Sequence, residues 1–293
     1  MRTLRVVLAV VVITAVASLS ACIPSPCDIF GGCGGGGSPA SVSGKWQILL
    51  TSNHSSSNNV EVDANFSQST GAISAVQSVI LSSSPCEFGT DFIQGTVKGS
   101  NINFTLAFGT GHPTASFSGS VSNNGLSMAG NYKIPSGDCT SSDSGTWAGT
   151  KFGDSSASYS GQVTSAVNSR VITVLAAIQE EAANNLQANL TLTNGGCSMI
   201  TLTGTAIGSV LQLQNGGGTI AFVAQASDPT YATLATRYEI GGTSCGTADN
   251  GMGTLSKLVP AVVGRSNASS QESTWVNPLT QALLKKVREN LHN

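Results

Sequence analysis

The stretch NINFTLAF, residues 101–108, alternates apolar and polar side chains with a period of two. Its apolar positions are Ile102, Phe104, Leu106 and Phe108, and its polar positions include Asn101, Asn103 and Thr105. Successive side chains of an extended strand point to opposite faces, so this order gives one apolar face and one polar face. The stretch therefore predicts a half-buried antiparallel strand.

The same alternation occurs on both sides of this stretch. Residues 60–66 place Val60, Val62, Ala64 and Phe66 on one face and Glu61, Asp63 and Asn65 on the other, and residues 186–192 and 211–214 follow the same pattern. Turn sequences separate the strands: STG at 69–71, KGSN at 98–101 and SNNG at 122–125. The Asn-Gly pair in the last one suits a type I′ hairpin turn, which needs positive φ. About eight short strands fit between Trp46 and Trp147.

Consecutive hairpins favour a meander, and a meander of eight strands removes its two exposed edges when the first strand pairs with the last. We therefore predict an all-β fold built from closed antiparallel barrels, with a β-sandwich of the same strand count as the alternative. The composition agrees, because charged residues make up only 10% of the chain while Gly, Ser and Thr are abundant.

The chain also repeats itself. NYKIPSGDC at 131–139 and RYEIGGTSC at 237–245 share a Tyr, an Ile two positions later and a Cys seven positions after the Tyr. Further matched anchors are Ala40–Gly44 with Ala157–Gly161, Cys86 with Cys197, Gly95–Thr96 with Gly204–Thr205, and Gly145 with Gly251. The offset falls steadily from 117 to 106, as loop deletions in the second copy would produce. Residues 40–151 and 157–257 are thus predicted to be two tandem copies of one domain of about 110 residues.

The first residues predict export. Residues 1–21, MRTLRVVLAVVVITAVASLSA, combine Arg2 and Arg5 with an apolar run and small residues, which is typical of a secretory signal. The following Leu19-Ser20-Ala21-Cys22 resembles the lipobox of bacterial lipoproteins. That resemblance implies cleavage before Cys22, lipidation of its thiol, and anchoring to a membrane of the bacterial cell envelope, the outer one if the cell has two. The alternatives are an ordinary cleaved signal followed by a chance Cys, and a transmembrane helix, for which the run is short.

Two further segments lie outside the repeats. Residues 22–39 are rich in Gly and predict a flexible tether. Residues 258–293 contain a linker and then LTQALLKKVRENLHN, where Leu279, Leu283, Val287 and Leu291 recur every four residues. This spacing predicts a short amphipathic C-terminal helix, packed on the second barrel or presented to a partner or a membrane.

The cysteines predict disulfides. Each repeat has two at equivalent places, Cys86 and Cys139 in the first and Cys197 and Cys245 in the second. Outside the cytoplasm such pairs are normally oxidised, and each would close a loop of about 50 residues and stabilise its domain by roughly 4 kcal/mol. Cys27 and Cys33 pair by elimination. Swapped connectivity stays open, and no Cys or His spacing matches a zinc site.

A further resemblance follows from SGKW at 43–46, which opens the first copy, and GTWAG at 145–149, which falls in its last strand. A Gly-x-Trp on the first strand of an eight-stranded barrel is similar to lipocalins and avidin-like barrels. The resemblance implies a cup for a small, mostly apolar ligand. The second copy departs from it, because Gly161-Gln162-Val163 has no Trp and Gly251-Met252-Gly253 stands in place of Gly145-Thr146-Trp147. The two tryptophans, Tyr132 and Tyr238 are expected in the core, with each tyrosine hydroxyl bonded to the backbone.

Catalysis has little support in the sequence. His54 and His112 lie in turns and His292 lies at the chain end. A disulfide between Cys86 and Cys139 would bring Glu87 near Asp138, but Ser198 and Ser244 replace this pair of carboxylates in the second copy. We therefore expect a protein that is not an enzyme and needs no cofactor or metal.

Two functions remain open. The first is an envelope lipoprotein whose barrels bind a small apolar ligand, which requires an internal cavity. The second is a structural or adhesion module that binds a protein or glycan through its outer face, with packed interiors and an exposed aromatic or apolar patch. A nucleic-acid partner is not expected, because removal of Arg2 and Arg5 leaves 11 basic against 15 acidic residues.

The mass of the mature protein tests the leader and the cysteines together. Intact mass spectrometry of protein from its own host should show cleavage before Cys22, added acyl chains, and a chain two hydrogens lighter for each of three disulfides. A mass equal to the reduced, unmodified chain would contradict both expectations.

Overall fold

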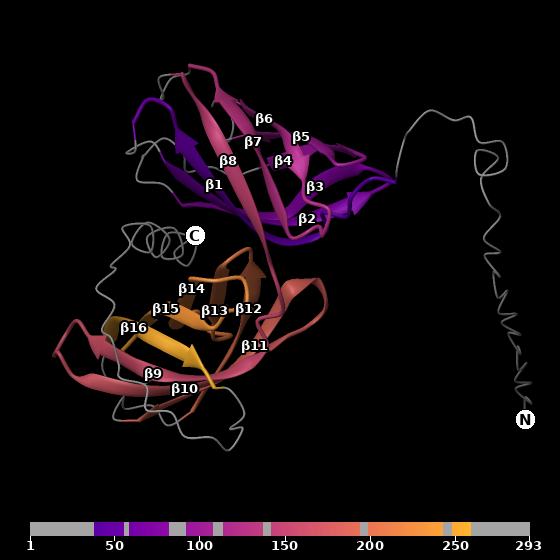
Figure 1. Cartoon of the computed structure of the whole chain (residues 1–293). Helices are drawn as coiled ribbons and strands as arrows, with labels where there is room; N and C mark the ends of the chain where they lie inside the picture. The colour runs from indigo at the N-terminus through magenta and orange to yellow at the C-terminus, as the bar shows by residue number, and fades with distance from the viewer. Residues whose placement is uncertain are drawn as a thin grey trace, which may run out of the picture. The chain divides into compact units, whose positions relative to one another are not determined.

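The computed structural model describes residues 38–55, 59–81, 92–107, 114–136, 142–193, 199–242 and 248–258, all within one compact unit that spans residues 37–293. These residues form sixteen antiparallel strands, arranged as two closed barrels of eight (Figure 1). The predicted all-β fold with two tandem barrels is confirmed. The predicted C-terminal helix lies outside the described residues.

The first barrel follows chain order from β1 to β8. Its strands are β1 (Gly44–Ser52), β2 (Val60–Ser69), β3 (Ala72–Leu81), β4 (Phe92–Lys98), β5 (Asn101–Ala107), β6 (Thr114–Val121), β7 (Ser127–Ile134) and β8 (Asp143–Phe152). The ring closes where β1 pairs with β8, with Trp46 opposite Lys151 and Ser52 opposite Gly145. Closure gives both edge strands a hydrogen-bonding partner, as expected for a meander of this length.

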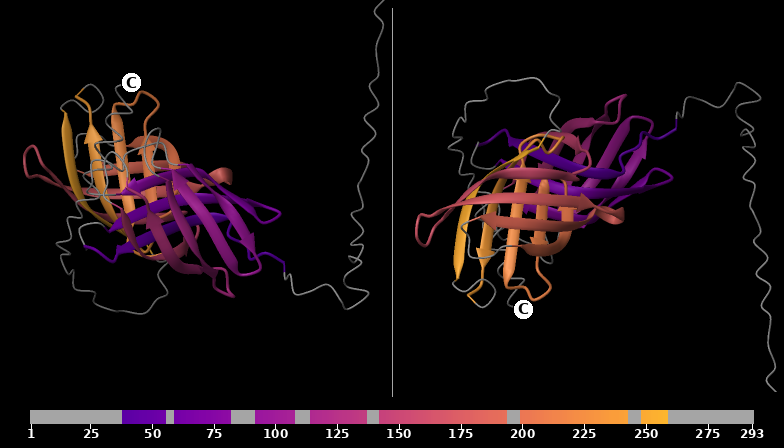
Figure 2. Two further views of the ribbon diagram at one scale, coloured as in Figure 1. Left: turned by 90° about the horizontal axis from the view of Figure 1, so that it is seen from above. Right: turned by 90° about the horizontal axis from the view of Figure 1, so that it is seen from below.

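The second barrel repeats this order. Its strands are β9 (Ala157–Ser165), β10 (Val171–Glu180), β11 (Asn185–Thr193), β12 (Ile200–Ile207), β13 (Val210–Gln214), β14 (Ile220–Ala226), β15 (Thr233–Ile240) and β16 (Asp249–Lys257), with a 3-10 turn η2 (Ala182–Asn184) before β11. Strand β9 pairs with β16 to close the ring. Figure 2 shows the strands of both barrels from two further directions.

The turns lie where the sequence signals predict them, but the turn at 122–125 is not of type I′, because Gly125 has positive φ and Asn124 does not. Thr70 and Gly71 between β2 and β3, Gly99 between β4 and β5, and Gly125 between β6 and β7 all have positive φ. Gly accepts this conformation at little cost, so these tight turns set the register of the strands on either side.

Aromatic side chains fill the interior of the first barrel. The rings of Phe104 and Phe117 stack with centroids 4.4 Å apart, and both lie edge-on to Trp147 at 5.4 and 6.1 Å. Glycines opposite these rings make the room. A Cβ added at Gly119 would lie 2.8 Å from Cζ2 of Trp147 and 2.2 Å from the carbonyl oxygen of Ala129. The interior is therefore packed because each large aromatic ring lies beside a glycine, which has no side chain.

The registers correct one feature of the sequence alignment. Ser52 faces Gly145 as Ser165 faces Gly251, so β1 and β9 correspond at an offset of 113 rather than 117. Trp46 then corresponds to Tyr159, and both residues are fully buried. The Trp46 indole N–H donates to the carbonyl of Val42, and the Tyr159 hydroxyl donates to the carbonyl of Ser155, in each case four residues earlier. The second copy thus has an aromatic residue, Tyr159, at the position of Trp46. The sequence alignment had instead matched Gly44 with Gly161, because both lie in Gly/Ser-rich sequence.

Among the described residues, no helix is both long and apolar enough to span a membrane.

Overfilling the first barrel should destabilise it. In Gly119→Val the new side chain collides with Trp147 and the neighbouring strand, and we expect a loss of roughly 1–3 kcal/mol in unfolding free energy. Urea unfolding followed by tryptophan fluorescence measures it. Gly216→Ala is the control, because nothing lies within 4 Å of a Cβ at that position. Equal stability of the two variants would contradict the packed interior.

Candidate functional site

A shallow hollow of about 440 Å³ lies on the outer face of the first barrel, across β4, β5, β6 and β7. Its outward side chains are Gln94, Asn103, Thr105, Ser116, Ser118, Asn131 and Lys133. They form two rows across the strands. One row runs Gln94–Thr105–Ser116–Lys133, and the other runs Asn103–Ser118–Asn131.

The chemistry of the hollow is that of neutral hydrogen bonding. Its side chains supply three amides, three hydroxyls and one ammonium group, and none of the described residues that line it is a carboxylate. Each amide carries both a donor and an acceptor, and each hydroxyl can serve as either. The hollow can therefore bind a ligand that presents many hydroxyl groups in a row.

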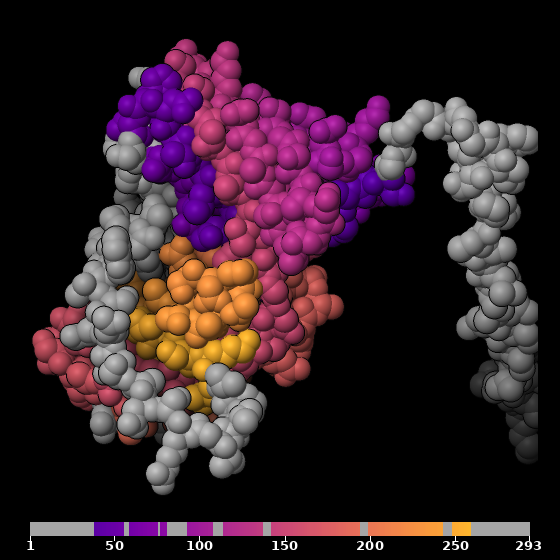
Figure 3. Space-filling model, viewed as in Figure 1, coloured from indigo at the N-terminus to yellow at the C-terminus, as the bar shows by residue number. Residues whose placement is uncertain are grey.

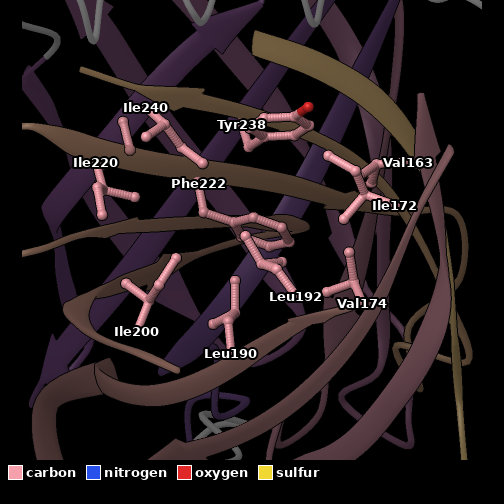
Figure 4. A pocket seen from close by; sticks show the side chains of 11 residues that line it. Val163, Ile172, Val174, Leu190, Leu192, Ile200, Ile220, Phe222, Tyr238 and Ile240 are labelled. Atoms are coloured by element: carbon pink, nitrogen blue, oxygen red, sulfur yellow. The ribbon is translucent and has the colours of Figure 1, made fainter. Parts of the chain in front are cut away.

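The interior of the second barrel contains an apolar void. It is lined by Val163, Ile172, Val174, Leu190, Leu192, Ile200, Ile220, Ala221, Phe222, Tyr238 and Ile240, and Phe222 lies among the labelled side chains that converge in Figure 4. The cavity measures about 10 Å³. Since a single water needs roughly 10–15 Å³, the interior is essentially packed.

A buried carboxylate closes each barrel at its seam. The Tyr132 hydroxyl donates to Oδ2 of Asp143 at 2.8 Å, and the Ser52 hydroxyl donates to its Oδ1 at 2.8 Å. This pair of bonds ties β7 and β1 to the start of β8. The tyrosine hydroxyl reaches a side chain, so the expected bond to the backbone is wrong.

The second barrel repeats the arrangement. The Tyr238 hydroxyl donates to Oδ2 of Asp249 at 3.0 Å, and the Ser165 hydroxyl donates to its Oδ1 at 2.6 Å. A Cβ at Gly251 would lie 2.7 Å from Cε1 of Tyr238, as one at Gly145 would lie 2.9 Å from Cε1 of Tyr132. The repeated Tyr and Gly positions thus mark the same seam in both barrels.

His54 completes the first seam. Its Nδ1 lies 2.9 Å from Oδ1 of Asp143, and its side chain is 59% exposed. Burial by itself would raise the pKa of Asp143, but hydrogen bonds from Ser52, Tyr132 and His54 outweigh it and hold this pKa below its ordinary value. The Ser52 hydroxyl donates to the carboxylate rather than to the imidazole. A serine nucleophile needs the opposite arrangement, so this cluster joins strands and is not a catalytic triad.

The sequence missed this cluster although a signal was present. Asp143 and Asp249 share the offset of 106 that relates Tyr132 to Tyr238 and Gly145 to Gly251. His54 lies 89 positions before Asp143, and no local motif joins the two residues. Extension of the repeat alignment by two positions would have found the aspartates, but only the closed fold brings His54 to them.

The other predicted site residues lie outside the described part of the chain. These are Cys22, Cys27, Cys33, Cys86, Cys139, Cys197 and Cys245, together with Glu87, Asp138, His112 and His292. The disulfides and the lipid anchor therefore stay predictions. Among the described residues, no group of three or more His, Cys, Asp or Glu side chains could hold a metal ion.

Comparison with known proteins gives no family. No protein-family model matches the chain, and no curated protein does. Solved structures that align include a protein of unknown function from the DUF3598 family of Nostoc punctiforme, at 12% identity and a TM-score of 0.23, over 74% of this chain and 96% of that one. A mutant of the vaccine antigen transferrin binding protein B from Haemophilus parasuis aligns at 15% identity and a TM-score of 0.25, over 68% of this chain. This chain spans 45% of that protein. Because these TM-scores are low, the fold assignment rests on the strand pairing alone.

Removal of the seam carboxylate should destabilise the first barrel in a pH-dependent way. Because the pKa of Asp143 is lower in the folded protein than in the unfolded chain, the ionised carboxylate stabilises the fold at pH values above the ordinary aspartate pKa. This stabilisation is lost as the pH falls through the folded-state pKa. Asp143→Asn should cost about 2 kcal/mol near neutral pH. It should also flatten the loss of stability below about pH 4.

Tryptophan fluorescence during urea unfolding measures this effect, because two of the three tryptophans, Trp46 and Trp147, lie in the first barrel. Asp249→Asn is the matched control, since it changes the same seam of the second barrel. If both variants shift the fluorescence transition equally, the prediction that each carboxylate stabilises its own barrel is wrong.

Proposed function

We propose that this protein is a lipid-anchored module of the bacterial cell envelope that binds a hydroxyl-rich polysaccharide on the outer face of its first barrel. The hollow across β4–β7 is the observation that carries the proposal. The predicted lipidation at Cys22 and the Gly-rich tether support display at a membrane surface.

Packing favours the outer face over the interior. Stacked rings fill the first barrel, and the cavity in the second has the volume of about one water. An eight-stranded barrel can be filled by side chains or hold one small ligand, and the described interiors are of the filled kind. A ligand that stays on the surface needs no rearrangement of either core.

The lining favours a glycan over a protein. Protein interfaces depend on buried aromatic residues and Arg, and Ser and Lys are depleted in them. Among the described residues, the exposed large apolar side chains are Leu49, Leu126, Val167, Val171, Leu175, Met199 and Leu258, and none of them is Phe, Trp or Tyr. The exposed patch expected for a protein or glycan partner is thus not aromatic on the described surface. The rows of amides and hydroxyls in the hollow match the hydroxyl groups of a sugar chain.

A small apolar ligand in the second barrel is the other candidate, and one observation favours it. The void there is lined almost wholly by aliphatic and aromatic carbon, with Tyr238 the one lining residue that has a side-chain hydroxyl. An apolar molecule would enter only if the barrel expanded, which costs packing energy at each displaced side chain.

Binding to polysaccharides tests the proposal. We expect the mature protein to bind neutral envelope or capsular polysaccharides on a glycan array, and Asn103→Ala with Asn131→Ala to weaken binding at least tenfold, since roughly 1–3 kcal/mol is lost for each hydrogen-bonding group left unpaired. Thr254→Ala, on the exposed outer face of the second barrel, is the control. Equal binding by all three proteins, or none, would overturn the proposal.

Native mass spectrometry separates the two candidates. Protein released from its host membranes should carry no small molecule within the barrels if the surface binds the ligand. A persistent added mass that Phe222→Trp removes and the Asn103/Asn131 double variant keeps would favour the interior instead.

A further inference from the structure

The polar side of β2 is buried although the sequence predicts it to face solvent. Glu61, Asp63 and Asn65 are 6%, 0% and 3% exposed. Their neighbours Val60, Val62 and Ala64 fill the interior of the first barrel, so these three polar side chains point outward. Something outside the first barrel must therefore cover them.

The turn between β12 and β13 of the second barrel covers this face. The amide N–H of Ser209 donates to Oδ1 of Asp63 at 2.5 Å, and the Asn65 side chain donates to the carbonyl of Ala206 at 2.7 Å. Gly208 has a φ of 54°, and a Cβ there would lie 2.2 Å from Oδ1 of Asp63. In Figure 3 the atoms of the two barrels meet on the viewed face. The contact thus uses a turn that only glycine can make at this distance.

Glu61 gathers donors from both barrels. Its Oε1 accepts from Gln47 at 2.7 Å, from Gln225 at 2.8 Å and from the hydroxyl of Ser209 at 3.3 Å. Donors from β1, from β14 and from the β12–β13 turn therefore converge on one carboxylate oxygen of Glu61.

Asp63 has the opposite environment. Its Oδ2 is buried and, among the described residues, is the one buried side-chain oxygen or nitrogen without a hydrogen-bond partner. Burial, and then the neighbouring charge of Glu61, raise the pKa of Asp63 well above its ordinary value. A proton on Asp63 turns the unpaired oxygen into a donor toward Glu61, which removes the defect.

No cation described near this face neutralises Asp63. Lys45 on β1 pairs with Glu180 on β10 and lies 4.8 Å from the ring centre of Tyr231. Asp154 in the linker adds negative charge beside Lys45. Tyr231, whose hydroxyl donates to the carbonyl of Gly208, faces the same turn as a neutral group, because burial raises its pKa. From the β12–β13 turn and from β14, the groups that donate to the carboxyls are the amide and hydroxyl of Ser209 and the side-chain amide of Gln225.

We propose that one proton shared by Asp63 and Glu61 joins the two barrels, so that the contact between β2 and the β12–β13 turn tightens as pH falls and loosens as pH rises. Two ionised carboxylates buried side by side would repel each other across a face that excludes water. The contact is thereby a proton-dependent latch that sets how firmly the second barrel is held against the first.

The direction follows from proton linkage. The closed contact holds a proton that the open, solvated carboxylates release above their ordinary pKa values of about 4. The closed state is therefore fully favoured below that range and loses stability as pH rises toward the raised pKa of Asp63.

Amide hydrogen exchange on the full chain tests the latch. Corrected for the intrinsic pH dependence of exchange, the opening of peptides that contain β2 and the β12–β13 turn should increase as pH rises above the ordinary range of a carboxyl pKa, by up to about tenfold per pH unit for one released proton. Peptides from β5 and β6 of the first barrel are the internal reference.

Asp63→Asn is the decisive variant. Its amide keeps an oxygen for the Ser209 N–H and places an N–H where the shared proton lies. Exchange should therefore become independent of pH, and it should be slower than in the wild type at alkaline pH. Glu61→Gln should also weaken the pH dependence, because one charge of the pair is gone. Glu181→Gln changes an exposed carboxylate of the second barrel and should behave as wild type.

Three results would overturn the latch. The first is equal protection of the wild type at every pH. The second is an Asp63→Asn variant in which the contact between β2 and the β12–β13 turn is open at every pH, while circular dichroism and the protection of β5 and β6 show that the barrels are folded. The third is a contact that Ca²⁺ or Mg²⁺ closes at alkaline pH in the wild type, because the carboxyls would then hold a metal ion in place of a proton.

Discussion

Closure of each eight-stranded ring is the constraint on which the rest of the structure depends. Pairing of β1 with β8 and of β9 with β16 gives every strand two neighbours, although β3 and β4 pair only over Ala72–Ser74 and Gln94–Thr96. It also fixes the interior volume, because the radius of a barrel follows from its strand number and stagger. Large rings can fill that space only where glycines stand opposite them, as Gly119 stands beside Trp147. Closure of the ring thus determines which side-chain sizes can pack inside it.

The seam carboxylates explain why the Tyr-containing sequence at 131–139 recurs at 237–245. In both barrels a tyrosine on the seventh strand, a glycine and an aspartate on the eighth, and a serine on the first meet at the pairing that closes the ring. A hydrogen bond to a buried carboxylate is stronger than one between neutral groups. These bonds therefore stabilise the pairing of the first strand with the last, which closes each barrel. Both copies keep this arrangement although Tyr159 of the second barrel occupies the position of Trp46 in the first. The barrel, rather than any ligand pocket, is what the two copies share.

Filled interiors leave the outer faces to differ, and the two faces of the first barrel have taken different roles. On β2 the outward polar residues are buried by the second barrel, and on β4–β7 a comparable set of polar residues remains open around a hollow. The first set contains two carboxyls and therefore responds to protons, whereas the second consists of amides, hydroxyls and one lysine. A change in pH would act on how the barrels are held together without altering the chemistry of the proposed binding face.

The sequence by itself determined the strands, the turns, the duplication and, through alternation and strand count, the closed barrels. These features are local or repeated, so a period of two, an Asn-Gly turn or a constant offset is enough to reveal them. Tertiary structure alone decided which polar faces are solvated. Glu61, Asp63 and Asn65 have the same alternation as Asn101, Asn103 and Thr105, yet the first three are buried and the others line or flank an exposed face. Period-two alternation identifies which side chains point away from a barrel's own core. What covers them depends on a turn more than 140 residues further along the chain, which no local pattern encodes.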